Sequence, residues 1–231
     1  MRPVDGRSVA RDWKQLVRRV EILDSGGMAA DPSPSSGDQP GTDSPEYGLT
    51  RSFGWSDMFV RPEDDPRTDG GFGNERTTLV GYLRDYRLTI ELKCSGLDAT
   101  GMACRSVEPS NLSLLGLVRH LADVERHWFR RVLDGQDTPR LYRRGDDRDA
   151  AFNGAIADPE VVASAWAAWR AEVSFAEHFV EEAPSLEVNG TYGKGDVISL
   201  REVLVHMIEE YARHAGHADL LRERIDGRVG Q

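Results

Sequence analysis

The sequence contains few cysteines and no long hydrophobic run. Cys94 and Cys104 are the two cysteines among 231 residues, too few for a disulfide framework, and their spacing matches no paired metal-ligand motif. No stretch of about 18 apolar residues occurs, which is the length that a membrane-spanning helix needs. The basic N-terminus also lacks the apolar core of a secretory signal. We therefore expect a cytoplasmic protein that does not insert into a membrane.

Basic residues are fewer than acidic residues. Lysine and arginine total 29 against 39 aspartates and glutamates, which gives a formal net charge of −10. Surfaces that bind nucleic acid or anionic lipid carry an excess of basic residues, so we expect neither partner. Neither a phosphate-binding glycine loop nor a Ser-His-Asp arrangement stands out. A small-molecule substrate is the partner that these exclusions leave.

The first 50 residues do not have the composition of a packed domain. Residues 28–50 are rich in Pro, Ser, Gly and Asp, and such a segment buries too little apolar surface to offset its ordering entropy. Before it, only Val9–Leu23 shows an amphipathic spacing. We expect a disordered or loosely attached extension over residues 1–50 and one folded domain over residues 51–231.

Four later segments have the apolar spacing of packed α-helices. They cover about residues 75–93, 113–133, 159–183 and 200–224. A long polar connection without periodicity separates the second segment from the third, and a short β-hairpin is expected near Asn189-Gly190. Helices of this number and length predict an all-α fold, a four-helix bundle.

The ends of the third and fourth helices are marked in the sequence. Asp158 followed by Pro159 is typical of an N-cap and a first helical position. Ser199 with Glu202 predicts a capping box, and Gly227 predicts the end of the last helix.

The fourth helix carries polar residues on its inward face. A buried carboxylate without a partner is costly, and Glu210 with His214, one helical turn apart, can bind a divalent metal. The apolar members of the same stripe show that this face is the packed one. The stripe, at spacings of 4, 3, 4, 3 and 4, consists of Val203, Met207, Glu210, His214, His217 and Leu221.

His120 supplies a third candidate ligand. It lies between Leu117 and Val124 at spacings of 3 and 4, on or beside the buried face of the second helix. With Glu210 and His214 it gives two imidazoles and one carboxylate, which leave a coordination position open as in catalytic zinc sites. The alternatives are an ordinary hydrogen-bonded core histidine and a plain Glu–His contact on a helix surface.

Other polar and aromatic residues receive weaker interpretations. His206 is an alternative ligand, and His217 is preferred as a residue that orients a ligand; both are also candidate general bases. The remaining histidines, His127 and His178, are expected at solvent or packing boundaries. Cys94 is expected to be a buried, unreactive thiol. Core positions are expected for Trp128, Trp166 and Trp169, and surface or inter-helix ion pairs for Glu125 and Glu209.

Three stretches, residues 75–97, 111–133 and 204–227, resemble the DinB-like superfamily, and more narrowly an actinobacterial branch of it. The second reads NLSLLGLVRHLADVERHWFRRVL and the third LVHMIEEYARHAGHADLLRERIDG. The resemblance extends over about residues 60–230. It implies a DinB-type four-helix bundle with a long crossover connection, which binds a divalent metal through three side chains.

The resemblance also implies a ligand set. Most of the superfamily uses three histidines, whereas a subset that includes mycothiol-dependent maleylpyruvate isomerases uses two histidines and a glutamate. In this sequence these positions fall on His120, Glu210 and His214. The usual His-Arg-Gly-Gln run after the last ligand reads His214-Ala215-Gly216-His217 here. The isomerase reaction itself is not expected, because those isomerases carry an additional C-terminal domain.

These observations lead to three functional hypotheses. The first is a metal-dependent S-transferase or isomerase that uses a low-molecular-weight thiol such as mycothiol, with zinc as the first choice of metal and nickel as the second. The second is a hydrolase that uses metal-bound water. The third is a non-catalytic, stress-related binding protein. The resemblance further implies a homodimer.

Overall fold

The computed structural model describes residues 59–68, 70–143 and 147–229. This part of the chain is mostly helical, and the sheet within it has two strands. No helix in these ranges is long and apolar enough to cross a membrane. The predicted extension over residues 1–50, with its Val9–Leu23 segment, lies outside the described residues, so its boundary with the folded domain stays a prediction.

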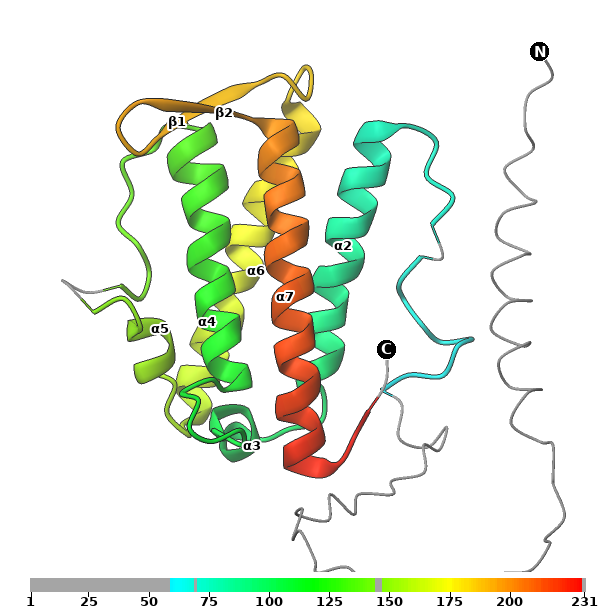
Figure 1. Ribbon diagram of the computed structural model, residues 1–231, viewed down its shortest axis with the longest axis vertical. Helices are drawn as coiled ribbons and strands as arrows, with labels where there is room; N and C mark the ends of the chain where they lie inside the picture. The colour runs from blue at the N-terminus through cyan, green and yellow to red at the C-terminus, as the bar shows by residue number, and fades with distance from the viewer. Residues whose placement is uncertain (1–58, 69, 144–146, 230–231) are drawn as a thin grey trace, which may run out of the picture. The chain divides into compact units, whose positions relative to one another are not determined.

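The four predicted helical segments are present and lie side by side (Figure 1). The α2 helix packs against α7, and α4 packs against both α6 and α7. The observed bounds match the predicted ones to within a residue or two, except that the second segment consists of two joined elements. The helices are α2 (Glu75–Cys94), α4 (Leu114–Glu125), α6 (Pro159–Glu182) and α7 (Leu200–Asp226).

The predicted helix ends are confirmed by their hydrogen bonds. Asp158 accepts from the backbone N–H of Glu160, with Pro159 in the first turn of α6. Ser199 and Glu202 form the capping box at the start of α7. Gly227 ends α7 with φ of 78°, a left-handed conformation that glycine adopts without steric cost.

The α4 helix continues as a π-helix, η2 (Arg126–Leu133), where the sequence predicted a regular helix up to residue 133. The backbone N–H of Asp134 donates to the carbonyl of Phe129, five residues earlier, at 3.0 Å. Because a wider turn shifts the inward face along the chain, Phe129 is fully buried. Trp128, predicted as a core residue, is only half-buried and packs against the core.

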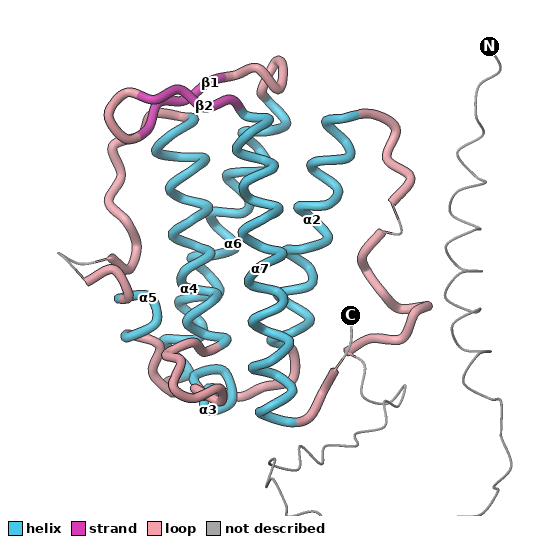
Figure 2. Tube along the Cα trace, in the orientation of Figure 1, coloured by secondary structure: helices cyan, strands magenta, loops and turns pink. Residues whose placement is uncertain are grey.

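The connections contain small elements that periodicity did not predict. They are α3 (Ala99–Ala103) and α5 (Ala150–Asn153), the latter within the long crossover between η2 and α6. The predicted hairpin is present as β1 (Asn189–Tyr192) and β2 (Asp196–Ser199), paired antiparallel. Figure 2 shows it at one end of the long helices, with α3 and α5 towards the other end.

The turn of the hairpin lies at residues 193–195 and not at Asn189-Gly190. Gly193 and Gly195 have φ of 59° and 107°. Gly190 lies within β1 instead, against the end of η2, where an added Cβ would stand 2.2 Å from the carbonyl oxygen of Val132. The glycine therefore permits close packing of the hairpin on η2.

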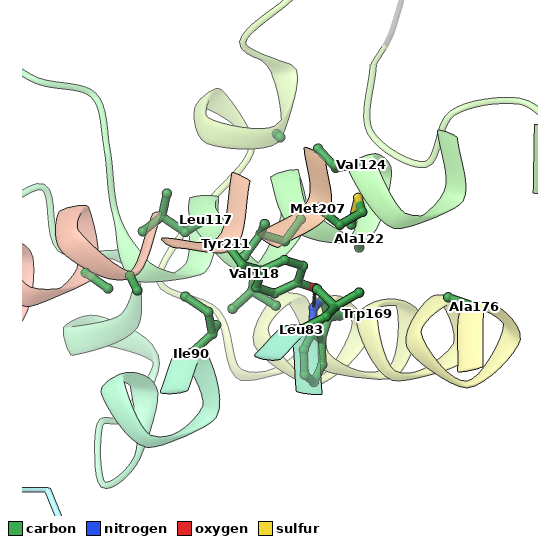
Figure 3. Packing of buried hydrophobic residues seen from close by; sticks show 14 of the residues in the cluster. Leu83, Ile90, Leu117, Val118, Ala122, Val124, Trp169, Ala176, Met207 and Tyr211 are labelled. Carbon is green, nitrogen blue, oxygen red and sulfur yellow. Dashed lines mark hydrogen bonds between the residues drawn. The ribbon is translucent and has the colours of Figure 1, made fainter. Parts of the chain in front are cut away.

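Each long helix contributes apolar side chains to one buried cluster (Figure 3). A fully buried Leu, Ile, Val, Phe or Met side chain in this cluster stabilises the fold by about 1.5–3 kcal/mol relative to leaving it in water. The predicted core position of Trp169 is confirmed, whereas Trp166 beside it is only half-buried. The labelled members are Leu83 and Ile90 of α2, Leu117, Val118, Ala122 and Val124 of α4, Trp169 and Ala176 of α6, and Met207 and Tyr211 of α7.

A chain of polar groups crosses this core. Arg87 of α2 donates from Nε and Nη2 to the two carboxylate oxygens of Glu125, both at 2.8 Å. The hydroxyl of Tyr211 donates to Glu125 at 2.7 Å and accepts from Nε1 of Trp169 at 2.8 Å. Glu125 therefore forms an inter-helix ion pair with Arg87, one of the two environments predicted for it, and its side chain is fully buried. Each of the four long helices supplies one member of this network.

Candidate metal centre

His120 of α4 meets Glu210 and His214 of α7 at the line where the two helices pack together, called here the α4–α7 seam. Nε2 of His120 lies 2.9 Å from Oε1 of Glu210, and Nε2 of His214 lies 3.3 Å from the same oxygen. The rings of His120 and His214 are 4.8 Å apart between centroids. One ligand atom from each of the three residues lies within 4.8 Å of the others.

Helical geometry brings these side chains together. Glu210 and His214 are four residues apart, so they project from the same side of α7. On α4, His120 lies beside the fully buried Leu117 and Leu121, at the border between core and solvent. The structure thus brings together the three residues that the sequence proposed as ligands.

Glu210 is ionised at this position. A hydrogen bond with His120 has the largest effect and one with His214 the next largest, and together they hold the pKa of the Glu210 carboxyl group well below the usual glutamate range. Burial has the opposite but smaller effect. Its side chain is 15% exposed and that of His214 is 10% exposed, whereas His120 is 29% exposed. The cluster is therefore partly buried, and His120 is its most exposed member.

The donor set fits a divalent transition metal. Zinc binds imidazole nitrogen and carboxylate oxygen at about 2.0–2.2 Å, so neighbouring ligands of a tetrahedral ion lie about 3.3 Å apart. The two nitrogen–oxygen distances, 2.9 and 3.3 Å, are close to that spacing. Imidazole also suits nickel, copper and iron, so the residues define the kind of metal but not the element.

The crossover covers one side of His120. The ring of Phe152, in α5, stacks on the imidazole at 5.5 Å between centroids and an interplanar angle of 27°. Phe152 also fills the space above Gly116, where an added Cβ would lie 2.6 Å from the phenyl ring. This contact was not predictable from the sequence, because the crossover has no periodic pattern.

Two side chains of α4 hold the crossover in place. Nε of Arg119 donates to the carbonyl of Ala151 at 2.7 Å. The carboxylate of the buried Asp123 accepts the backbone N–H groups of Leu141 and Tyr142 at 2.6 and 3.1 Å. The position of α5 beside His120 therefore depends on residues adjacent to the ligand itself.

His217 contacts one of the ligands. Its Nδ1 lies 3.2 Å from Nδ1 of His214, so one ring donates and the other accepts. Burial, followed by the charges of His214 and Arg213, lowers the pKa of His217. This is the geometry of a residue that fixes the orientation of His214.

His206 lies apart from the ligand cluster. Its ring packs edge-to-face against the indole of Trp128 at 4.9 Å between centroids, one turn before Glu210. Among the described residues, the cluster of three metal-ligating side chains consists of His120, Glu210 and His214. His206 therefore contacts η2 through Trp128 and is not a member of the cluster.

The other candidate residues have simple surroundings, with one exception. His178 is exposed, as predicted. Cys94 is buried, and burial raises the pKa of its thiol to about 12, which agrees with an unreactive group. The exception is His127, whose Nδ1 is buried without a hydrogen-bond partner among the described residues. No pattern in the sequence indicated this environment.

Comparison with known proteins gives a family match. The model of the mycothiol-S-transferase family matches residues 78–227, more than half of the chain, and this range includes every residue of the cluster. The search of curated proteins finds no match. Among solved structures, a conserved protein from Enterococcus faecalis is similar, with a TM-score of 0.46 and 15% identity over 64% of this chain and 95% of that chain.

Proposed function

We propose that this protein transfers a low-molecular-weight thiol of the mycothiol type to an electrophilic small molecule. The chain belongs to the mycothiol-S-transferase family, a DinB-like family. The observation that carries the proposal is the convergence of His120, Glu210 and His214 within the matched region. We also propose that the four long helices form a DinB-type bundle around this centre, and that the protein works as a homodimer.

The proposed centre holds zinc, or nickel as the second choice. A divalent ion held by His120, Glu210 and His214 would lower the pKa of a bound thiol, so that the thiol would be present as thiolate at neutral pH. The ionised Glu210 would offset part of the charge of the ion, and the imidazoles of His120 and His214 would complete the donor set.

The reaction needs a proton acceptor as well as a nucleophile. The thiol loses its proton, its sulfur forms a bond to the electrophilic carbon, and the carbon either expels a leaving group or passes the electron pair to an atom that is then protonated. We assign to His217 the orientation of His214, through their 3.2 Å contact. His206 and His217 are the candidate bases for the thiol proton.

The test combines metal analysis with thiol-dependent turnover on the full chain. Wild type is expected to contain about one metal ion per chain by plasma mass spectrometry, and His214→Ala and Glu210→Gln are expected to lose it. Glu209→Gln, which removes the neighbouring exposed carboxylate, serves as the matched control and should retain the metal.

Turnover is then measured with mycothiol and a panel of electrophiles. Conjugation that needs both the thiol and the metal supports the proposal. A chelator-sensitive reaction that proceeds without thiol would instead support hydrolysis by metal-bound water. Metal-loaded protein that binds ligands but converts none would support a binding protein, and either result would overturn the transferase assignment.

A further inference from the structure

The α2 and α6 helices leave an open cavity between them, called here the α2–α6 cavity. The α2 helix packs on α7, and α4 packs on α6 and α7, whereas α2 and α6 approach one another less closely. The cavity has a volume of about 440 Å³, within the range of about 300–1,000 Å³ that is usual for small-molecule sites. None of its described lining residues belongs to the metal cluster. Its apolar walls consist of Val80, Leu83, Ala176, Val180 and Leu204.

The apolar walls belong to the folded core. Leu83, Ala176 and Leu204 are fully buried members of the central cluster, and Val80 is partly buried and packs against it. Because the core holds these side chains, the walls are in place before a ligand binds, which lowers the entropic cost of binding. An apolar molecule in the cavity would be stabilised by leaving water.

A buried arginine also lines the cavity. The side chain of Arg87 is only 7% exposed, and its Nε and Nη2 donate to the carboxylate of Glu125. Its remaining nitrogen, Nη1, lies 3.6 Å from a carboxylate oxygen of Glu177, which is longer than a hydrogen bond. Nη1 of Arg87 can therefore donate to an oxygen atom of a ligand in the cavity.

Glu177 has room to move away from Arg87. Its side chain is 54% exposed. Arg87 and Glu177 also line a second, smaller cavity of about 240 Å³, further along α2 and α6, so the pair lies at the border between the two spaces. Exposed side chains change rotamer within nanoseconds. Glu177 can therefore turn towards the second cavity while a ligand occupies the first.

The local charge favours a neutral ligand. The buried Glu125 already balances the charge of Arg87, so the nearby carboxylate of Glu177 leaves an excess of negative charge. The other two charged lining residues, Arg76 and Glu181, are of opposite sign, and Arg76 already donates to two carbonyl groups at the end of α6. A carboxylate ligand would meet this negative charge and would also lose its hydration. A neutral carbonyl oxygen accepts a hydrogen bond without either penalty.

We infer that the α2–α6 cavity binds a neutral, largely apolar molecule whose carbonyl oxygen accepts a hydrogen bond from Nη1 of Arg87. The apolar part of the molecule lies against the side chains of Val80, Leu83 and Leu204. The ligand class is therefore that of apolar ketones, esters and amides, and not that of the corresponding acids. The inference does not rest on the proposed function, because no ligand of the metal centre takes part in the site.

Binding is tested on the full-length chain with three small aromatic probes of similar shape. Acetophenone carries the carbonyl group, ethylbenzene lacks it, and benzoate replaces it with a carboxylate. Acetophenone is expected to bind saturably, and the other two about tenfold more weakly, the effect of losing one hydrogen bond to a charged donor. Spectra of protein with ¹³C-labelled valine and leucine methyl groups locate the probe. Shifts are expected at Val80, Leu83 and Leu204 and not at Val197, in the exposed strand β2.

Two variants separate the contributions of shape and charge. Val80→Phe adds bulk at the cavity wall and is expected to weaken acetophenone binding about tenfold or more, whereas Val197→Phe, in the exposed strand, should leave it unchanged. Glu177→Gln removes the excess negative charge and is expected to strengthen benzoate binding several-fold. Glu160→Gln, at the other end of α6, should leave the affinity for benzoate unchanged.

Four results would overturn the inference. The first is that acetophenone shifts none of the cavity methyl groups, which is also the outcome if another part of the chain or a second copy fills the cavity. The second is equal affinity for acetophenone and ethylbenzene, which would exclude a hydrogen bond from Arg87. The third is wild-type affinity for acetophenone in Val80→Phe. The fourth is equal affinity for benzoate in wild type and Glu177→Gln.

Discussion

At the scale of single residues, the buried polar network depends on Tyr211. The phenol donates to Glu125 and accepts from Trp169, and burial together with the Glu125 charge raises its pKa well above the usual range. The hydroxyl is thus protonated at neutral pH and can donate to Glu125. A carboxylate in this position is tolerated only because Arg87 and Tyr211 both donate to it.

Tyr211→Phe is therefore expected to destabilise the protein by about 1–3 kcal/mol, since it leaves the Trp169 N–H without an acceptor and Glu125 with one donor fewer. Urea unfolding measures the effect. Tyr82→Phe, which removes a hydroxyl from a half-exposed ring, is the control and should change the free energy of unfolding by less than about 0.5 kcal/mol. Equal stability of both variants would show that the network contributes nothing to folding.

His127 gives a prediction about pH. Its pKa falls from 6.5 to about 4 on folding, so between these values the unfolded chain binds more protons than the folded protein. The stability contributed by neutral His127 is present above about pH 6.5 and is lost as the pH falls to about 4. In His127→Phe this loss is absent, so its melting temperature should fall less than that of wild type over this window. Parallel curves for the two proteins would contradict the buried, neutral state of His127.

At the scale of elements, the sequence predicted what local spacing controls. Apolar residues at helical intervals predicted the four long helices, and short-range caps such as Ser199 with Glu202 confirmed their ends. The π-helix escaped prediction because its wider turns accompany tertiary packing against the hairpin at Gly190. The crossover escaped it because α5 is held by Arg119, a contact between residues some 30 positions apart.

The same distinction holds for the site. His120, Glu210 and His214 were predictable because each lies on an inward stripe and matches a ligand position of the superfamily. The surroundings of His127 were not predictable, since they depend on where the crossover places Arg140. Local spacing therefore indicates which residues face the seam, and tertiary contacts determine what surrounds them.

Gly190→Ala tests the contact between hairpin and π-helix. The added methyl group would meet the Val132 carbonyl, so the strand must move, and we expect a loss of about 1–3 kcal/mol in the free energy of unfolding. Gly216→Ala, within α7 and with nothing within 4 Å of the added Cβ, is the matched substitution and should stabilise by about 0.5–1 kcal/mol. Urea unfolding of both variants gives the comparison. A free energy of unfolding that is unchanged in Gly190→Ala would show that the hairpin packs loosely on η2.

At the scale of the whole molecule, the candidate metal centre joins two helices from distant parts of the sequence. His120 and Glu210 are 90 positions apart, and the α4–α7 seam that joins them also carries His217. An ion held by both helices would bind the folded chain and not the unfolded one. Metal binding and folding would therefore be coupled.

Metal removal should accordingly lower thermal stability. A ligand at 100 times its dissociation constant stabilises the folded state by about 2.7 kcal/mol, which corresponds to roughly 5–10 °C in the melting temperature of a domain of this size. Excess chelator is expected to lower the melting temperature of metal-loaded wild type by that amount, and added zinc should restore it. His120→Ala, without a complete ligand set, should melt at the same temperature with and without chelator, whereas His178→Ala, on the exposed face of α6, should behave as wild type. If neither chelator nor zinc changes the melting temperature of wild type, then His120, Glu210 and His214 join α4 and α7 through their own hydrogen bonds and not through a metal ion.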